Sequence, residues 1–260
     1  LSIRQAIAGD LDLWEGLLDE GVAEPDPLTL FAFRWLRDHL PADDRPAVLV
    51  QGDAGAGNFL FDEKGVTGVV DWEMAHIGHP LEDLGCILAR SLVQPMADAD
   101  TLLSLYREAD DGGWTRDELL YATILVMTRF SVPIALALES RHTGIDFGLM
   151  NSYFRLSQIS LVRLIAQAEG IALDETVPAV GPRPAIGFEL EYLRDVLAAI
   201  VRPAIEDSYA RYRLDGAIGL IGYLRAAQGT DTASTPPSRG AEGSDARALL
   251  QGFMTQALWR

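Results

Sequence analysis

The chain combines long stretches in which apolar residues recur every three or four positions with one central stretch of short apolar runs separated by polar turns. Residues 10–20 and 27–40 show the first pattern and are predicted to form helices. Pro27 suits a first helical turn, and Pro41 is expected to end the second helix. These two helices lead directly into the central stretch, residues 48–85.

The central stretch is predicted to contain a strand followed by a β-hairpin. The apolar residues 48–50 indicate a buried strand. Residues 59–61 and 66–70 are two further apolar runs, and the turn sequence at 62–65, Asp-Glu-Lys-Gly, separates them. Because a hairpin folds the chain back on itself, the residues just before its first strand and just after its second strand should lie close together.

Three polar residues occupy those positions. Asp53 and Asn58 lie in the loop before the hairpin, and Asp71 follows its second strand. Carboxylate and carboxamide oxygens suit Mg²⁺, which usually keeps several waters and shares substrate phosphates. A carboxylate that does not bind the metal can act as a base that receives or orients a hydroxyl proton. The stretch therefore predicts a magnesium site beside a catalytic base.

The order of these residues, GDAGAGN, then DWE, then GHPLEDLG, resembles the aminoglycoside phosphotransferase (APH) family of kinase-like small-molecule phosphotransferases. It is similar in particular to the branch that includes the kinase-like domain of acyl-CoA dehydrogenase family members 10 and 11. The resemblance implies Asp53 as catalytic base, Asn58 and Asp71 as Mg²⁺ ligands, and Asp83 as a support for the catalytic loop. That branch usually has His at the position of Gln51, which we expect to act as a second supporting residue.

The implied reaction is the transfer of the ATP γ-phosphoryl group to a hydroxyl of a small molecule, with Mg²⁺ as cofactor and ATP as co-substrate. Aminoglycoside, choline and hydroxyacyl-type acceptors all remain open. The alternative is a non-catalytic binding or scaffolding protein that keeps the kinase-like fold. Gln51 favours this alternative, whereas the presence of Asp53, Asn58 and Asp71 together argues against it, because a scaffold needs no such set.

The resemblance covers only the C-terminal lobe of a kinase-like enzyme, roughly residues 10–170. The N-terminal lobe of such enzymes supplies a sheet, a loop over the phosphates and a lysine that pairs with them. Nothing before Val48 has that pattern, and Lys64, the only lysine of the chain, lies in the hairpin turn. The first residue is not Met, so we expect a fragment that is inactive alone.

The remainder of the chain is predicted to be helical. Helices are expected at residues 80–90, 98–109, 116–140, 147–169, 185–212, 214–228 and 244–259. Thr115 and Glu118 form a capping-box pattern, and Gly170 is expected to stop a helix. We further expect an interruption near Pro203 and a helix N-cap at Ser244.

The predicted fold class is α+β but mainly α, with a kinase-like C-terminal lobe, a small hairpin sheet and a helical appendage. The predicted boundaries are residues 1–172 for the lobe, 173–184 for a Pro-rich linker and 185–260 for a small helical domain. Within that domain, residues 229–243 have a composition typical of disorder. The appendage carries no cluster of catalytic residue types and could support homo-oligomerisation.

Composition narrows the partners and the compartment. With 38 acidic and 21 basic residues, the formal charge of −17 argues against nucleic acid as a partner. The single cysteine, Cys86, is expected to be a small core residue, and His76 and His79 are expected to be structural or exposed. The apolar residues 121–138 contain Arg129 and a proline, which favours a buried helix over a membrane span. A small molecule and a nucleotide in the cytoplasm are the expected setting.

Overall fold

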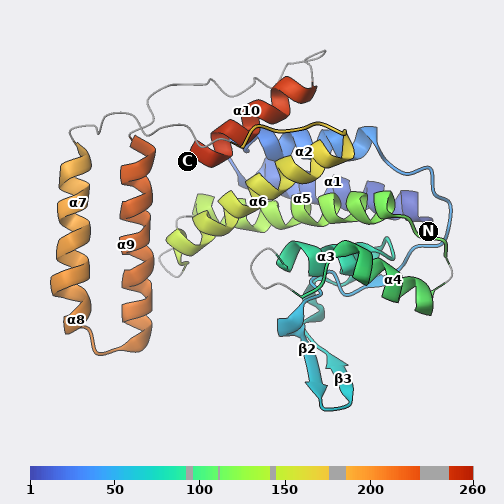
Figure 1. Ribbon diagram of the computed structural model, residues 1–260, viewed down its shortest axis with the longest axis horizontal. Coiled ribbons are helices and arrows are strands. Elements are labelled where there is room, and N and C mark those ends of the chain that lie inside the picture. Colours follow the sequence, from blue (N-terminus) through green and yellow to red (C-terminus); the bar gives the residue numbers. More distant parts are fainter. Residues whose placement is uncertain (92–95, 111, 141–144, 176–185, 229–245, 260) are drawn as a thin grey trace.

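The structure is a computed structural model that describes residues 1–91, 96–110, 112–140, 145–175, 186–228 and 246–259. This part of the chain is mainly helical, with two small two-stranded antiparallel sheets (Figure 1). The predicted fold class, mainly α with a small hairpin sheet, is confirmed.

Two helices open the chain. α1 (Ile3–Gly21) begins seven residues before the helix predicted at 10–20. Ser2 and Gln5 explain the earlier start, because each side chain accepts a hydrogen bond from the other residue's backbone amide in a capping box. α2 (Pro27–Asp38) begins as predicted.

α5 (Arg116–Ser140) and α6 (Phe147–Ala168) pack together at the centre of the molecule (Figure 1). The predicted bounds of α5 are confirmed, and its capping box forms between Thr115 and Glu118. Among the described helices, α5 alone is long and apolar enough to span a membrane by length and composition, and 67% of its most apolar window is buried inside the protein. The prediction of a buried helix is therefore confirmed.

Other helices cover this central pair. α3 (Glu82–Arg90) and both N-terminal helices pack on α5, and α4 (Ala99–Ala109) contacts α3 and α5. α10 (Ala246–Trp259) packs on α6 and contributes Leu250 to the hydrophobic core. Because α5 is surrounded in this way, it is buried on nearly all sides from Leu119 to Val132.

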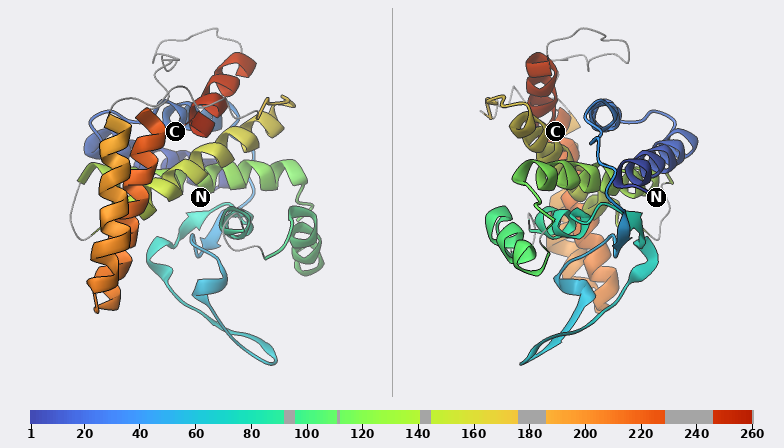
Figure 2. Two further views of the ribbon diagram at one scale, coloured as in Figure 1. Left: turned by 60° about the vertical axis from the view of Figure 1, so that its left-hand side comes forward. Right: turned by 90° about the vertical axis from the view of Figure 1, so that its right-hand side faces the viewer.

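The two sheets arise from the central stretch. β2 (Phe59–Asp62) and β3 (Gly65–Val69) form the predicted hairpin, which extends away from the helices (Figure 2). β1 (Val48–Val50) pairs with β4 (His76–Gly78), a strand that the sequence analysis did not predict. Three residues with the sequence His-Ile-Gly are too short to carry a strand pattern. Two single-turn 3₁₀ helices, Ala56–Asn58 and Trp72–Met74, flank the hairpin.

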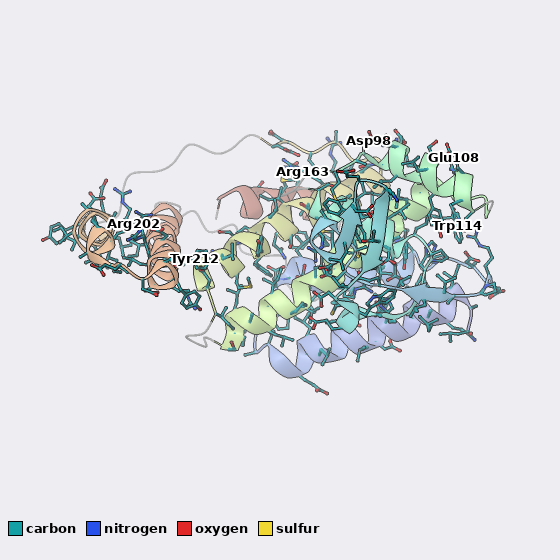
Figure 3. All side chains as sticks on the ribbon, turned by 90° about the horizontal axis from the view of Figure 1, so that it is seen from below. Asp98, Glu108, Trp114, Arg163, Arg202 and Tyr212 are labelled. Carbon is teal, nitrogen blue, oxygen red and sulfur yellow. The ribbon has the colours of Figure 1, made fainter. Side chains whose placement is uncertain are left out.

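A second pair of helices stands beside the lobe. α7 (Ile186–Val196) continues through a π-helical turn at Leu197–Val201 into α8 (Arg202–Ala204), and α9 (Ser208–Gln228) returns antiparallel to them. Figure 3 shows Arg202 and Tyr212 on this pair, at the opposite end of the molecule from Asp98 and Trp114.

Of two predictions about this pair, one is confirmed and one was wrong. The interruption expected near Pro203 is confirmed: the π-helical turn precedes this proline, and α8 ends at Ala204, one residue after it. The break follows at residues 205–207, and α9 is continuous where a division between 212 and 214 was expected. Residues 176–184 of the linker predicted at 173–184 lie outside the described residues, as do the polar stretch at 229–243 and the predicted N-cap Ser244. The domain boundaries therefore stay a prediction.

Candidate active site

The loop after β1 is held from below by α3. The carboxylate of Asp83 accepts hydrogen bonds from the backbone amides of Gln51 and Gly52, both at 2.9 Å. Gly52 adopts φ +84°, and a side chain there would collide with the carbonyl of Met74. Asp83 thus fixes the start of the loop that carries Asp53. The sequence analysis expected Asp83 to support this loop.

Gln51 joins this loop to the end of the hairpin. Its buried side chain donates from Nε2 to the carbonyl oxygens of Val70 (3.0 Å) and Asp71 (2.6 Å). Its Oε1 accepts from the backbone amide of Asp53 at 2.8 Å. A neutral imidazole would also offer one donor and one acceptor, so glutamine can supply the hydrogen bonds that a histidine would make here.

Asp53 and Asn58 are in direct contact. Nδ2 of Asn58 donates to the backbone carbonyl of Asp53 at 2.9 Å and to its carboxylate Oδ2 at 3.1 Å. The carbonyl oxygen of Asn58 accepts from the backbone amide of Val70 at 3.0 Å. Since Val70 immediately precedes Asp71, the hairpin brings the backbones of Asn58 and Asp71 to its base, as its predicted geometry required.

Asp71 adopts an unusual backbone conformation. Its φ of 61° and ψ of 60° place it in the left-handed region, and it is the only non-glycine residue with positive φ in the described part of the chain. Such a conformation costs of order 1–3 kcal/mol and tends to occur at functional sites. The residue is exposed, whereas Asn58 beside it is buried.

The structure adds Arg90 to these residues. This arginine ends α3, and its guanidinium forms an ion pair with Oδ1 of Asp53. The sequence analysis missed it, because a basic residue in the last turn of a helix is usually explained by the helix dipole. Asp53, Arg90 and mainly apolar side chains of α5 and α6 line a cavity of about 420 Å³.

A buried ionic cluster supports the same loop. Arg129 of α5 lies 2.9 Å from the carboxylate of Glu82 and 3.5 Å from that of Asp10, and the Glu82 carboxylate lies 2.9 Å from His76. The cluster joins four elements, α1, β4, α3 and α5. Arg129 also donates to the carbonyl of Gly52 at 3.4 Å. Arg129 supplies the positive charge between these acids, which argues for an ionic support rather than a metal site.

The charges of the cluster depend on one another. Burial raises the pKa of Glu82, but the hydrogen bond with His76 and the charge of Arg129 outweigh it and lower the pKa to about 2. Burial of His76 lowers its pKa, but the hydrogen bond and charge of Glu82 prevail and raise it above the ordinary 6.5. Beside the cluster, burial raises the pKa of the Cys86 thiol to about 12, which fits the predicted core role.

The raised pKa of His76 predicts a pH-dependent contribution to stability. The protonated imidazole favours the folded state, so its contribution is complete below pH 6.5 and is lost as the pH rises through the folded-state pKa. The wild type should therefore exceed His76→Gln in unfolding free energy by a margin that shrinks from pH 5.5 to pH 8.5. Urea denaturation across this range measures the margin, and a constant margin would contradict the prediction.

His79 provides a matched contrast. Burial lowers its pKa, so the neutral imidazole is favoured in the folded protein. Its contribution is present above pH 6.5 and is lost as the pH falls through the lowered pKa. The margin between the wild type and His79→Gln should consequently grow with pH, opposite to the margin for His76→Gln.

Comparison with known proteins places this site in context. Residues 4–120 match the family model described as "Phosphotransferase enzyme family", APH. A solved structure described as a "putative aminoglycoside phosphotransferase", from Ralstonia eutropha, is similar with a TM-score of 0.53 at 16% identity. The similarity covers 64% of this chain and 56% of that one, and it shows the fold alone.

Curated relatives match over shorter segments. Acyl-CoA dehydrogenase family member 11 from Gallus gallus is 36% identical over 73 residues, which cover 27% of this chain and 9% of that protein. The Homo sapiens protein of the same name is 44% identical over 52 residues, covering 19% of this chain and 7% of the relative. The chain thus matches less than a tenth of the length of either relative.

Proposed function

We propose that this chain carries the catalytic loop and metal site of an ATP-dependent kinase that phosphorylates a hydroxyl of a small molecule. The match of residues 4–120 to the model described as "Phosphotransferase enzyme family" supports this proposal. The observation that carries the proposal is the contact between Asp53 and Asn58 at the base of the hairpin whose second strand is followed by Asp71. The sequence around these residues also resembles that of kinase-like phosphotransferases.

The donor set suits Mg²⁺. Nδ2 of Asn58 donates its hydrogen bonds to Asp53, so the carboxamide oxygen of Asn58 points away from Asp53 and is available as a metal ligand. This oxygen and the exposed carboxylate of Asp71 are hard ligands of the kind that Mg²⁺ prefers. Bound Mg²⁺ would neutralise charge on the phosphates of the nucleotide.

Asp53 has the role of a base that receives or orients the acceptor hydroxyl. Its carboxylate is held on one side by Arg90 and on the other by Asn58, so its direction is set before substrate arrives. It also faces the 420 Å³ cavity, which has room for a small acceptor. Much of the catalysis would come from this positioning.

The chain is proposed to act together with a nucleotide-binding lobe and to be inactive alone. The similarity to the solved structure covers 56% of that structure. The only lysine of the chain, Lys64, lies in the hairpin turn, so it does not take the place of the phosphate-pairing lysine that the N-terminal lobe of kinase-like enzymes supplies. Aminoglycoside, choline and hydroxyacyl-type compounds are the candidate acceptors.

Asp71→Asn should weaken the binding of Mg·ATP at least tenfold in the full gene product, because a metal ligand loses its charge. Asparagine is the informative substitution, since it tolerates the left-handed backbone of residue 71. Isothermal titration calorimetry measures the affinity, with Glu63→Gln at the exposed hairpin turn as control. Failure of the wild-type protein to bind Mg·ATP would instead support a non-catalytic scaffold.

A further inference from the structure

Arg90 changes the electrostatic character of the cavity beside Asp53. Apart from these two, the cavity is lined by apolar side chains, including Met127, Phe130 and Ile134, and by the hydroxyl-bearing Tyr153 and Ser157. Among the described residues that line the cavity, Asp53 and Arg90 are therefore the only charged ones, and they pair with each other. The pocket that would receive the acceptor is close to neutral, although the whole chain carries −17.

Arg90 is held in place by the loop that it faces. A side chain at Gly55 would collide with the Arg90 side chain and would lie 2.9 Å from its Nε. That Nε is buried and has no hydrogen-bond partner among the described residues. The guanidinium thus packs closely against the loop while its terminal nitrogen contacts Asp53, so its charge is fixed within the pocket.

A fixed guanidinium has a direct consequence for the acceptor. A cationic alcohol that brings its hydroxyl to Asp53 must place its positive charge close to the Arg90 guanidinium, which contacts Asp53 and repels a second cation. An uncharged apolar alcohol meets no such repulsion and covers the apolar walls. We propose that Arg90 is a specificity-determining residue that makes this pocket select uncharged apolar alcohols over cationic ones.

This inference rests on the proposed function, because it treats the cavity as the acceptor pocket. The inference distinguishes among the acceptors that the family resemblance leaves open, because aminoglycosides and choline are cationic and would be poor acceptors. Specificity here comes from the repulsion between Arg90 and a cation together with the attraction between the apolar walls and an apolar alcohol.

Two alcohols of nearly the same shape test the proposal. Choline and 3,3-dimethylbutan-1-ol differ in the replacement of a quaternary nitrogen by carbon, hence by one positive charge. Ligand-observed NMR titration of this chain gives the dissociation constant of each without any nucleotide. The neutral alcohol should bind at least about tenfold more tightly to the wild type.

Variants at residue 90 separate the arginine from the apolar walls. Arg90→Gln should reduce the preference for the neutral alcohol by about tenfold or more, since Asp53 then attracts the cation. Arg90→Lys should retain it, and Arg34→Gln, which removes an exposed arginine elsewhere, should leave it unchanged. Thermal unfolding of each variant establishes that it is folded.

Equal or tighter binding of choline by the wild type would overturn the proposal, as would a preference that persists in Arg90→Gln or an absence of binding by both alcohols. These outcomes are distinct from failure of the proposed function. The titration requires no phosphoryl transfer, so a protein that never uses ATP can still show the preference, and an active kinase can lack it.

Discussion

Arg129→Met is expected to lower the free energy of unfolding by about 3–5 kcal/mol, because it leaves the buried carboxylate of Glu82 without its main counter-charge. The two side chains are 2% and 1% exposed, so water cannot take the place of the guanidinium. Methionine has a similar length and keeps much of the packing within α5. Urea denaturation followed by circular dichroism measures the change.

Two comparisons isolate the charge. Arg116→Met removes an exposed arginine paired with Asp100 and should change the unfolding free energy by less than about 1 kcal/mol. Adding Glu82→Leu to Arg129→Met should recover part of the loss, because the most deeply buried carboxylate of the cluster is then removed. A double variant no more stable than Arg129→Met would show that the loss comes from packing.

Asp53→Asn should lower the rate of phosphoryl transfer by the full gene product by about a hundredfold to ten-thousandfold, because the amide cannot accept the hydroxyl proton. Asparagine keeps the size of the side chain and an oxygen that can accept from Asn58, so the loop should keep its shape although the ion pair with Arg90 is lost. Formation of the phosphate ester is followed by phosphorus NMR with a panel of small alcohols.

Nucleotide binding is the control for this variant. Mg·ATP affinity should stay within about threefold of the wild type, since the proposed ligands are Asn58 and Asp71. Glu63→Gln at the exposed hairpin turn should leave both turnover and affinity unchanged. Turnover by Asp53→Asn at the wild-type rate would remove this residue from the mechanism.

The sequence alone determined the features that depend on residues close to one another along the chain. The turn at 62–65 sets the hairpin, and the hairpin brings Asn58 and Asp71 together within fourteen residues. The same locality explains the correct bounds of α5 and the capping box at Thr115, since both depend on residues three or four positions apart.

Tertiary structure decided the contacts between elements. Arg90 meets Asp53 only because α3 packs beneath the loop, and Arg129 meets Asp10 across 119 positions only because α1 and α5 are neighbours. β4 exists because its partner β1 lies beside it. Periodicity records which face of an element is buried but carries no information about what lies opposite, so these partners follow from the packing of the whole fold.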